Sequence, residues 1–150
     1  MRLLLQRTTT AWVTFPGHHN QPQGPGLAVL VGFCQGDVES LLEPMADKMI
    51  TLRIFPDEEG RMNRSLADTG GTLVLVPQFT LYADARKGRR PNFMRALEPE
   101  KASGLFQRFA DICRGRVPHT QTGQFGADMD VHLVNQGPVT ILLDSQEMGW

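Results

Sequence analysis

Cysteine is scarce in this chain, which has two in 150 residues, and long apolar runs are absent. Cys34 and Cys113 lie far apart, without the CxxC or Cys/His spacing of redox motifs and metal sites, so we expect two buried thiols. No segment approaches the ~20 apolar residues of a membrane span. Residues 1–7 form a segment that is too short, and too polar at its C-terminal end, to be a secretory signal. The sequence therefore predicts a cytoplasmic protein that needs neither disulfide bonds nor a membrane.

An excess of charge of one sign is also lacking, because the formal net charge is −1. This near-neutral balance argues against a general polyanion binder, so any contact with nucleic acid has to come from a local patch. The one dense basic cluster comprises Arg86, Lys87, Arg89 and Arg90. A charge run is usually a solvated surface, but guanidinium groups bind phosphates well, and we favour binding to an RNA backbone.

Hydrophobic patterning predicts one α+β domain, residues 1–150, that is rich in strands and has two main helices. The expected strands are 2–7, 10–15, 27–33, 73–81, 131–134 and 139–143. Residues 16–25 read as a loop, since they are rich in proline and glycine. One helix is expected after an Asp37 cap, with Leu42, Met45 and Met49 on its apolar face. A second helix is expected from Pro99 to Arg114, with Gly115 ending it.

The residues that could carry chemistry offer no clear metal or nucleophile site. Asp128, Asp130 and His132 alternate along an expected strand and share a face, but a solvated sheet face explains them better than a metal site. Thr80 follows a strand and has no histidine near it in sequence, so we expect it to position groups rather than to act as a nucleophile. We therefore expect no metal and no cofactor.

The step from Gly137 to Pro138 lies between two expected strands. Cis peptide bonds occur almost only before proline, and they mark tight turns. A glycine at this position removes a side chain, so that backbone carbonyls could approach a ligand closely.

Many ordered segments of this chain resemble the D-aminoacyl-tRNA deacylase family. They are Gln6-Arg7, Leu52–Phe55, Asp57–Asn63, Gln78–Asp84, Arg86–Pro91, Thr122–Met129 and Val134–Thr140. The resemblance covers nearly the whole chain. It implies a homodimer with a compact, barrel-like arrangement of mixed β-sheets and two main helices.

The resemblance also implies hydrolysis of the ester between a D-amino acid and the 3′-terminal adenosine of tRNA. In such enzymes the Gly-Pro step is cis and enters the active site of the other subunit. The carbonyls of Gly137 and Pro138 would hold the α-amino group and leave no room for an L side chain. Arg7 would brace this motif across the dimer. Glycyl-tRNA, which has no side chain to reject, is an expected further substrate.

The catalytic residues implied by the resemblance are Gln78, Phe79 and Thr80. Backbone N–H groups near Phe79 and Thr80 would stabilise the oxyanion, while the vicinal ribose hydroxyl orients water. The substrate's adenosine is assigned to the segment that contains Phe125, Ala127 and Met129.

The chain departs from the family pattern at Pro77, where the family has serine, and in the loop 16–25. Proline removes a hydroxyl and an N–H beside the site. It is reminiscent of a related branch that removes L-alanine from mischarged tRNA. Two alternatives therefore stay open: an L-alanyl-tRNA deacylase, favoured by a trans Gly137–Pro138 bond, and a non-catalytic RNA- or partner-binding relative.

Overall fold

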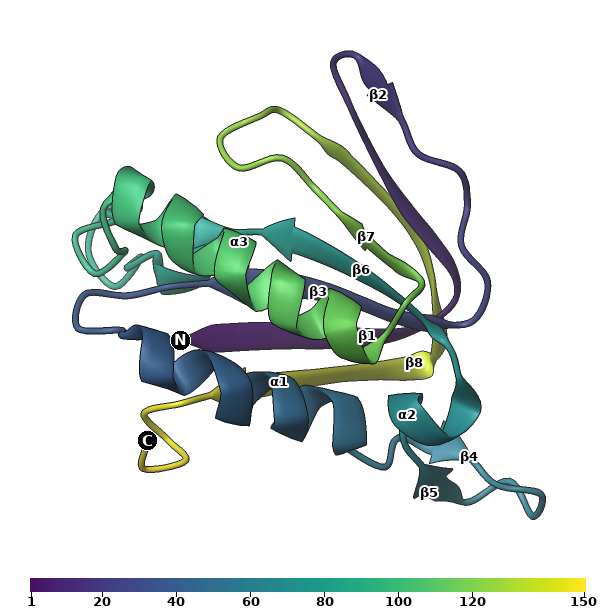
Figure 1. The fold of residues 1–150 in the computed structure, drawn as a ribbon. Coiled ribbons are helices and arrows are strands. Elements are labelled where there is room, and N and C mark those ends of the chain that lie inside the picture. Colours follow the sequence, from purple (N-terminus) through teal and green to yellow (C-terminus); the bar gives the residue numbers. More distant parts are fainter.

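The computed structural model describes residues 1–150, which form a mixed β-sheet flanked by helices (Figure 1). Strands and helices follow in the order β1 (Arg2–Phe15), β2 (His18–His19), β3 (Gly26–Gly32), the 3₁₀ helix η1 (Glu39–Leu41), α1 (Leu42–Thr51), β4 (Phe55–Pro56), β5 (Met62–Arg64), α2 (Leu66–Thr69), β6 (Thr72–Pro77), the 3₁₀ helix η2 (Phe79–Tyr82), α3 (Pro99–Arg116), β7 (Thr120–Thr122) and β8 (Asp130–Asp144). The α+β class with two main helices is confirmed.

The sheet has the order β2-β1-β3-β6-β7, and β8 pairs with the other edge of β1. β1 is antiparallel to β3 and β8, whereas β6 is parallel to both β3 and β7. The two short strands expected within residues 2–15 form one long strand, β1. The two expected within residues 131–143 likewise form one long strand, β8. The register of β1 against β8 shifts between Gln6 and Thr10, so bulges bend the strands where we expected breaks.

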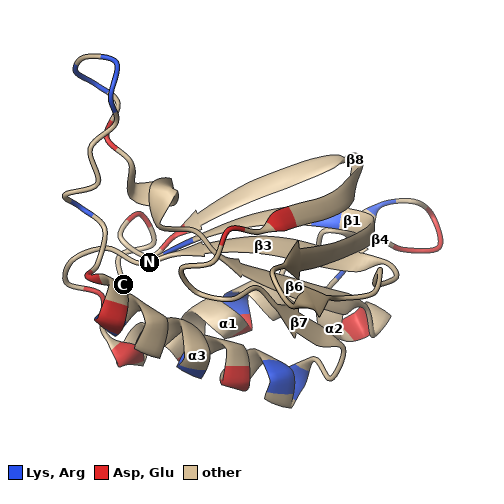
Figure 2. Cartoon of the chain, turned by 90° about the horizontal axis from the view of Figure 1, so that it is seen from above, with Lys and Arg blue, Asp and Glu red and all other residues tan.

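Beyond these bulges, the outer halves of β1 and β8 rise away from the helices as an arm (Figures 1 and 2). The predicted loop 16–25 closes this arm and is partly a hairpin. Pro16 and Gly17 form its turn, Gly17 has φ +82°, and His18 pairs with Phe15. The prediction of a loop was therefore wrong at His18 and His19, because the glycine supplies the turn and the proline lies outside the paired positions.

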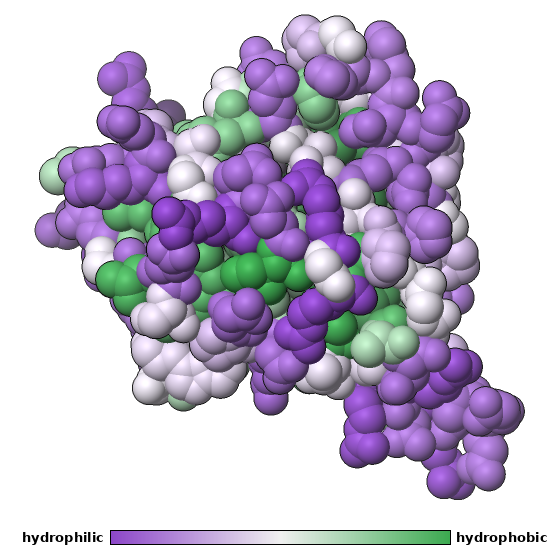
Figure 3. Space-filling model, viewed as in Figure 1, coloured by the Kyte–Doolittle hydropathy of each residue, from purple (hydrophilic) through white to green (hydrophobic).

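Helices α1 and α3 cover one face of the sheet, and the main core lies between the two layers. A smaller cluster on the opposite face joins Ala11 and Val13 of the arm to Ala28, Val74 and Val76. Strand β3 is therefore covered at Ala28 on this side as well, while Leu30 stays partly exposed there, and apolar residues on both of its faces explain its continuous apolar sequence. The molecular surface on the side of the helices is largely hydrophilic, and apolar residues are visible in a central band along the helices (Figure 3).

The helix boundaries differ from the prediction at two points. Asp37 does not cap α1: its carboxylate accepts hydrogen bonds from the Cys34 N–H and the Met1 amino group, both at 2.7 Å, and a 3₁₀ turn precedes the helix. Gly115 does not end α3, which continues to Arg116. The apolar face of α1 and the N-terminal Pro99 of α3 are confirmed.

Both cysteines are free and buried, as expected. None of the helices is long and apolar enough to cross a membrane.

Candidate active site

The chain turns sharply where β6 ends at Pro77. The strand predicted to reach Leu81 stops here, and residues 79–82 form the 3₁₀ helix η2. The N–H of Gln78 donates to the carbonyl of Val31 at 2.7 Å, which fixes the turn to the end of β3. The first N–H groups of such a helix have no partner within it. The N–H groups of Phe79 and Thr80, at the start of η2, therefore have no hydrogen-bond partner within this helix.

Side chains around this turn form a small polar and aromatic group. The Gln78 amide donates to the Thr80 hydroxyl, and no titratable side chain bonds to that hydroxyl. The Phe79 ring lies edge-on to Phe93, with ring centroids 4.9 Å apart. Gln78 thus orients the hydroxyl, while Phe79 faces outward to a second aromatic ring.

A mostly apolar pocket of about 390 Å³ opens beside η2. Its walls comprise Pro77, Phe79, Phe93, Ala96, Leu97, Glu98, Pro99, Phe125 and Gly126. The structure thus brings together three residues singled out in the sequence, Pro77, Phe79 and Phe125. It adds Phe93, which sequence reasoning missed. The available signal was an apolar Phe93-Met94 pair, separated from the basic cluster by two residues and outside any helical or strand pattern.

Ala127 and Met129 do not line this pocket. The N–H of Ala127 closes a turn onto the Gln124 carbonyl at 3.3 Å. The Met129 sulfur accepts from the Gln124 N–H at 3.3 Å, and its side chain packs against the smaller core cluster. In the structure both residues shape the loop that carries Phe125.

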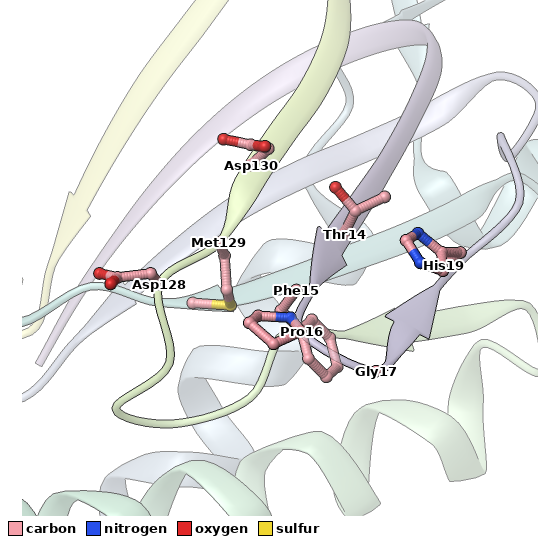
Figure 4. A pocket seen from close by; sticks show the side chains of 8 residues that line it. All are labelled: Thr14, Phe15, Pro16, Gly17, His19, Asp128, Met129 and Asp130. Carbon is pink, nitrogen blue, oxygen red and sulfur yellow. The ribbon is translucent and has the colours of Figure 1, made fainter.

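Met129 instead lines a second, more polar pocket of about 430 Å³ at the tip of the arm, together with Thr14, Phe15, Pro16, Gly17, His19, Asp128 and Asp130 (Figure 4). The two carboxylates and His19 lie on different sides of this pocket. The expectation that Asp128 shares a strand face with Asp130 and His132 was wrong, because β8 begins at Asp130. His132 stacks on Trp12, with ring centroids 4.5 Å apart.

Gly137 and Pro138 lie within β8, and the peptide bond between them is cis. Gly137 has φ +119°, and a Cβ there would lie 3.1 Å from Arg7 Nη2 and 3.0 Å from Val139 Cγ2. Arg7 is buried and donates to the Ile54 carbonyl at 2.6 Å. The sequence-based expectation placed Arg7 across a dimer from this motif; the structure places it against the motif of its own chain.

The motif lies near the start of β3, where Arg7 pairs with Leu27, whereas η2 follows Gln78, which bonds to Val31 at the end of β3. Arg2 Nη1 donates to the Leu81 carbonyl of η2 at 2.8 Å, whereas Arg7 contacts Gly137. Both arginines are on β1, five residues apart, which corresponds to about 17 Å. One chain therefore does not bring Gly137 and Pro138 to Phe79 and Thr80.

Arg2 anchors η2, a role that the sequence did not reveal. Its Nε donates to Asp144 at 2.6 Å, and its guanidinium lies over the Tyr82 ring, 4.6 Å from the centroid. Burial raises the pKa of the Tyr82 hydroxyl, which therefore stays neutral. Residues from both ends of the chain thus hold η2 in place.

The basic cluster extends from a short stem in which Asp84 and Asn92 exchange backbone hydrogen bonds of 2.8 and 3.0 Å. Asp84 also binds Arg86 through its carboxylate, and the side-chain and backbone hydrogen bonds of Arg86 hold the pKa of Asp84 well below its usual value. Lys87, Arg89 and Arg90 are exposed and pair with no carboxylate. Figure 2 shows this cationic tip projecting from the body of the molecule.

Comparison with known proteins shows similarity along nearly the whole chain. The profile of the family described as D-Tyr-tRNA(Tyr) deacylase matches residues 4–144. A D-aminoacyl-tRNA deacylase of Thermomicrobium roseum is 52% identical over 148 residues, which cover 99% of this chain and 96% of that protein.

Two solved structures are also similar. One, described as a c-Myc DNA unwinding element binding protein, is 38% identical with a TM-score of 0.89, covering 97% of this chain and 99% of that one. A probable eukaryotic D-amino acid tRNA deacylase is 18% identical with a TM-score of 0.83, covering 95% and 97%, and shares the fold.

Proposed function

The chain belongs to the D-Tyr-tRNA(Tyr) deacylase family, and we propose that it hydrolyses the ester joining a D-amino acid to the 3′-terminal adenosine of tRNA. The observation that carries this proposal is the apolar pocket of Phe79, Phe93 and Phe125 directly beside the first N–H groups of η2. The pocket suits a nucleoside base, and the adjoining N–H groups suit a developing oxyanion.

Water is activated by the substrate rather than by a side-chain base. Glu98 is the one carboxylate that lines the pocket, but its side chain is 73% exposed and pairs with Lys101 at 3.3 Å. The vicinal ribose hydroxyl is already held next to the ester, so it can orient water at no cost in association entropy. Gln78 orients Thr80, and the Thr80 hydroxyl positions the ester.

The complete site is formed by two copies of the chain. Arg2 contacts η2 and Arg7 contacts Gly137, and these arginines lie about 17 Å apart along β1, so a partner has to supply the Gly-Pro motif. A surface for this contact lies on the sheet face away from the helices, where Leu142 pairs with Leu4, and Leu4 with Leu30. Leu142 is 46% exposed. Docking two such faces buries the apolar row and gives the barrel-like homodimer that the family resemblance implies.

The Gly-Pro motif provides chiral selection through backbone alone. Arg7 and Val139 pack against Gly137 so closely that the backbone there cannot easily yield to an intruding side chain. Such a wall rejects an L side chain sterically and admits glycine, so glycyl-tRNA is included in the proposed substrates.

Lys87, Arg89 and Arg90 bind the tRNA backbone. They project without acidic partners from a stem that begins two residues after η2. In a chain of net charge −1, this local patch provides the attraction to a polyanion.

Residues 1–150 act as one domain, because β1 and β8 pair along most of their length although they come from opposite ends of the sequence. The proposed substrate places the protein in the cytoplasm, where charged tRNA meets the ribosome.

Hydrolysis of D-tyrosyl-tRNA and L-alanyl-tRNA, measured side by side at matched low enzyme concentration, tests the proposal. We expect rapid loss of the D-ester alone, with Pro77 tolerated. Preferential loss of the L-alanyl ester would place the chain in the sister branch. Inertness toward both would favour nucleic-acid binding, which the name of one solved relative describes for that protein.

A further inference from the structure

We propose that Phe93 and Met94 form a stacking platform for the unpaired nucleotides that precede the terminal adenosine of the substrate RNA. This inference rests on the proposed function and extends its site outward. It assigns Lys87, Arg89 and Arg90 to the phosphates of the same single-stranded segment.

The first argument is the exposure of neighbouring apolar side chains. Phe79 is 52% exposed, Phe93 39% and Met94 77%. Phe79 and Phe93 are in edge-on contact, and the exposed Met94 follows Phe93 directly in the chain. Single exposed apolar residues are ordinary, but a contiguous group at the mouth of a pocket marks a binding surface.

The second argument is that the backbone under this surface is fixed. The Met94 N–H donates to Asn92 Oδ1 at 3.2 Å, and the Met94 carbonyl accepts from Gln35 Nε2 at 2.6 Å. The Gln35 N–H donates to the Arg95 carbonyl at 2.9 Å, and the Leu97 N–H donates to the Phe33 carbonyl at 3.0 Å. The platform is therefore organised before any ligand binds, which reduces the entropic cost of binding.

The third argument is that the platform adjoins the cationic tip in the chain. The platform begins one residue after Asn92, which closes the stem of the cationic tip, and it ends at the apolar pocket. An RNA end whose last nucleoside fills the pocket and whose phosphates reach the cationic tip passes Phe93 and Met94, which lie between the two in the chain. Aromatic or apolar surface beside cations is the combination that holds single-stranded nucleic acid, through base stacking and phosphate contacts. An uncharged protein segment would use the apolar surface but not the cations.

The test measures kcat/KM for D-tyrosyl esters of adenosine, of the dinucleotide CA and of the trinucleotide CCA. For the wild type we expect each added nucleotide that stacks to raise kcat/KM by about tenfold. Met94→Ala and Phe93→Ala should abolish most of this gain from adenosine to CCA. Phe93→Tyr, which keeps a ring, should retain the gain.

The readout is the ratio of kcat/KM for the CCA ester to kcat/KM for the adenosine ester, measured with one enzyme. A loss of the terminal nucleoside contact in Phe93→Ala affects both substrates and therefore cancels in this ratio. Met62→Ala is the matched control, because Met62 is 57% exposed but lies on β5, away from the pocket. An unchanged gain in both platform variants, or no gain in the wild type, would overturn the platform and leave the deacylase intact. Failure of the wild type to hydrolyse even the adenosine ester would overturn the proposed function as well.

Discussion

Thr80 presents a hydroxyl whose bonding partner is the amide of Gln78, two residues earlier. An amide can orient a hydroxyl but cannot take its proton at neutral pH. Activation of Thr80 as a nucleophile would need a base within hydrogen-bond reach. We therefore propose that Thr80 positions the ester and that water cleaves it.

Thr80→Ala should lower kcat by about tenfold, the equivalent of one lost hydrogen bond. Thr80→Ser, which keeps the hydroxyl, should retain most of the activity. Single-turnover hydrolysis of D-tyrosyl-tRNA provides the measurement. Complete inactivity of Thr80→Ala with an unchanged circular dichroism spectrum would instead identify Thr80 as the nucleophile.

Gly137 occupies a backbone position that only glycine adopts without strain. Gly137→Ala combines φ +119° with close approach to Arg7 and Val139, so we expect a loss of roughly 1–3 kcal/mol in the free energy of unfolding. Urea denaturation measures it. Gly104→Ala in α3 is the control: a Cβ there meets open space, and the variant should be as stable as the wild type or more so. Equal effects of the two substitutions would refute the argument from packing at Gly137.

At the scale of elements, η2 is held by strands from both ends of the chain. Arg2 joins the Leu81 carbonyl to Asp144, and the Tyr82 ring packs beneath its guanidinium. Burial of Asp144 by itself raises the pKa of the carboxyl, but the hydrogen bonds from Arg2 and the Gln146 N–H outweigh it and lower the pKa below its ordinary value. The Asp144 carboxylate therefore stabilises the folded state when it is ionised.

Asp144→Asn should lower the free energy of unfolding at neutral pH by roughly 1.5–3 kcal/mol, since it weakens hydrogen bonds to a charged group. Because the folded-state pKa is lowered, the wild-type advantage is full above about pH 4 and is lost as pH falls through the folded pKa. Urea denaturation at several pH values tests this. Asp111→Asn, which breaks an exposed pair with Arg114, should have little effect. A wild-type advantage that persists in strong acid would contradict the account.

The sequence predicted the elements that depend on local patterning. The buried strand β3, the apolar face of α1 and the Pro99 start of α3 follow from periodicity and capping chemistry. The long strands β1 and β8 were split in prediction, because a bulge and a strand end look alike in a hydrophobic pattern. Phe93 and Arg2 were missed because their roles depend on residues far away in sequence, Phe125 and Asp144 respectively.

For the molecule as a whole, the account requires two copies. The two halves of the proposed site lie at opposite ends of β3, and we propose the apolar row of Leu142, Leu4 and Leu30 as the docking surface between copies. A charge in this row would remain unpaired when two such faces meet, at a cost of several kcal/mol.

Leu142→Lys should therefore convert the proposed dimer to a monomer and lower activity on D-tyrosyl-tRNA by at least about 10²-fold. Sedimentation velocity and the deacylation assay provide the two readouts. Val38→Lys places the same charge at another exposed apolar residue, before η1, and should change neither. An active Leu142→Lys monomer would show that one chain carries a complete site.

The most direct measurement is the hydrolysis of D-tyrosyl and L-tyrosyl esters of the same tRNA by the wild-type protein. The two substrates differ only in configuration at Cα, so binding of the RNA and of the adenosine cancels in the comparison. A steric backbone wall predicts kcat/KM for the D-ester roughly 10²-fold or more above that for the L-ester. Equal rates for the two enantiomers would contradict selection by Gly137 and Pro138 and, with it, the proposed proofreading of D-aminoacyl-tRNA.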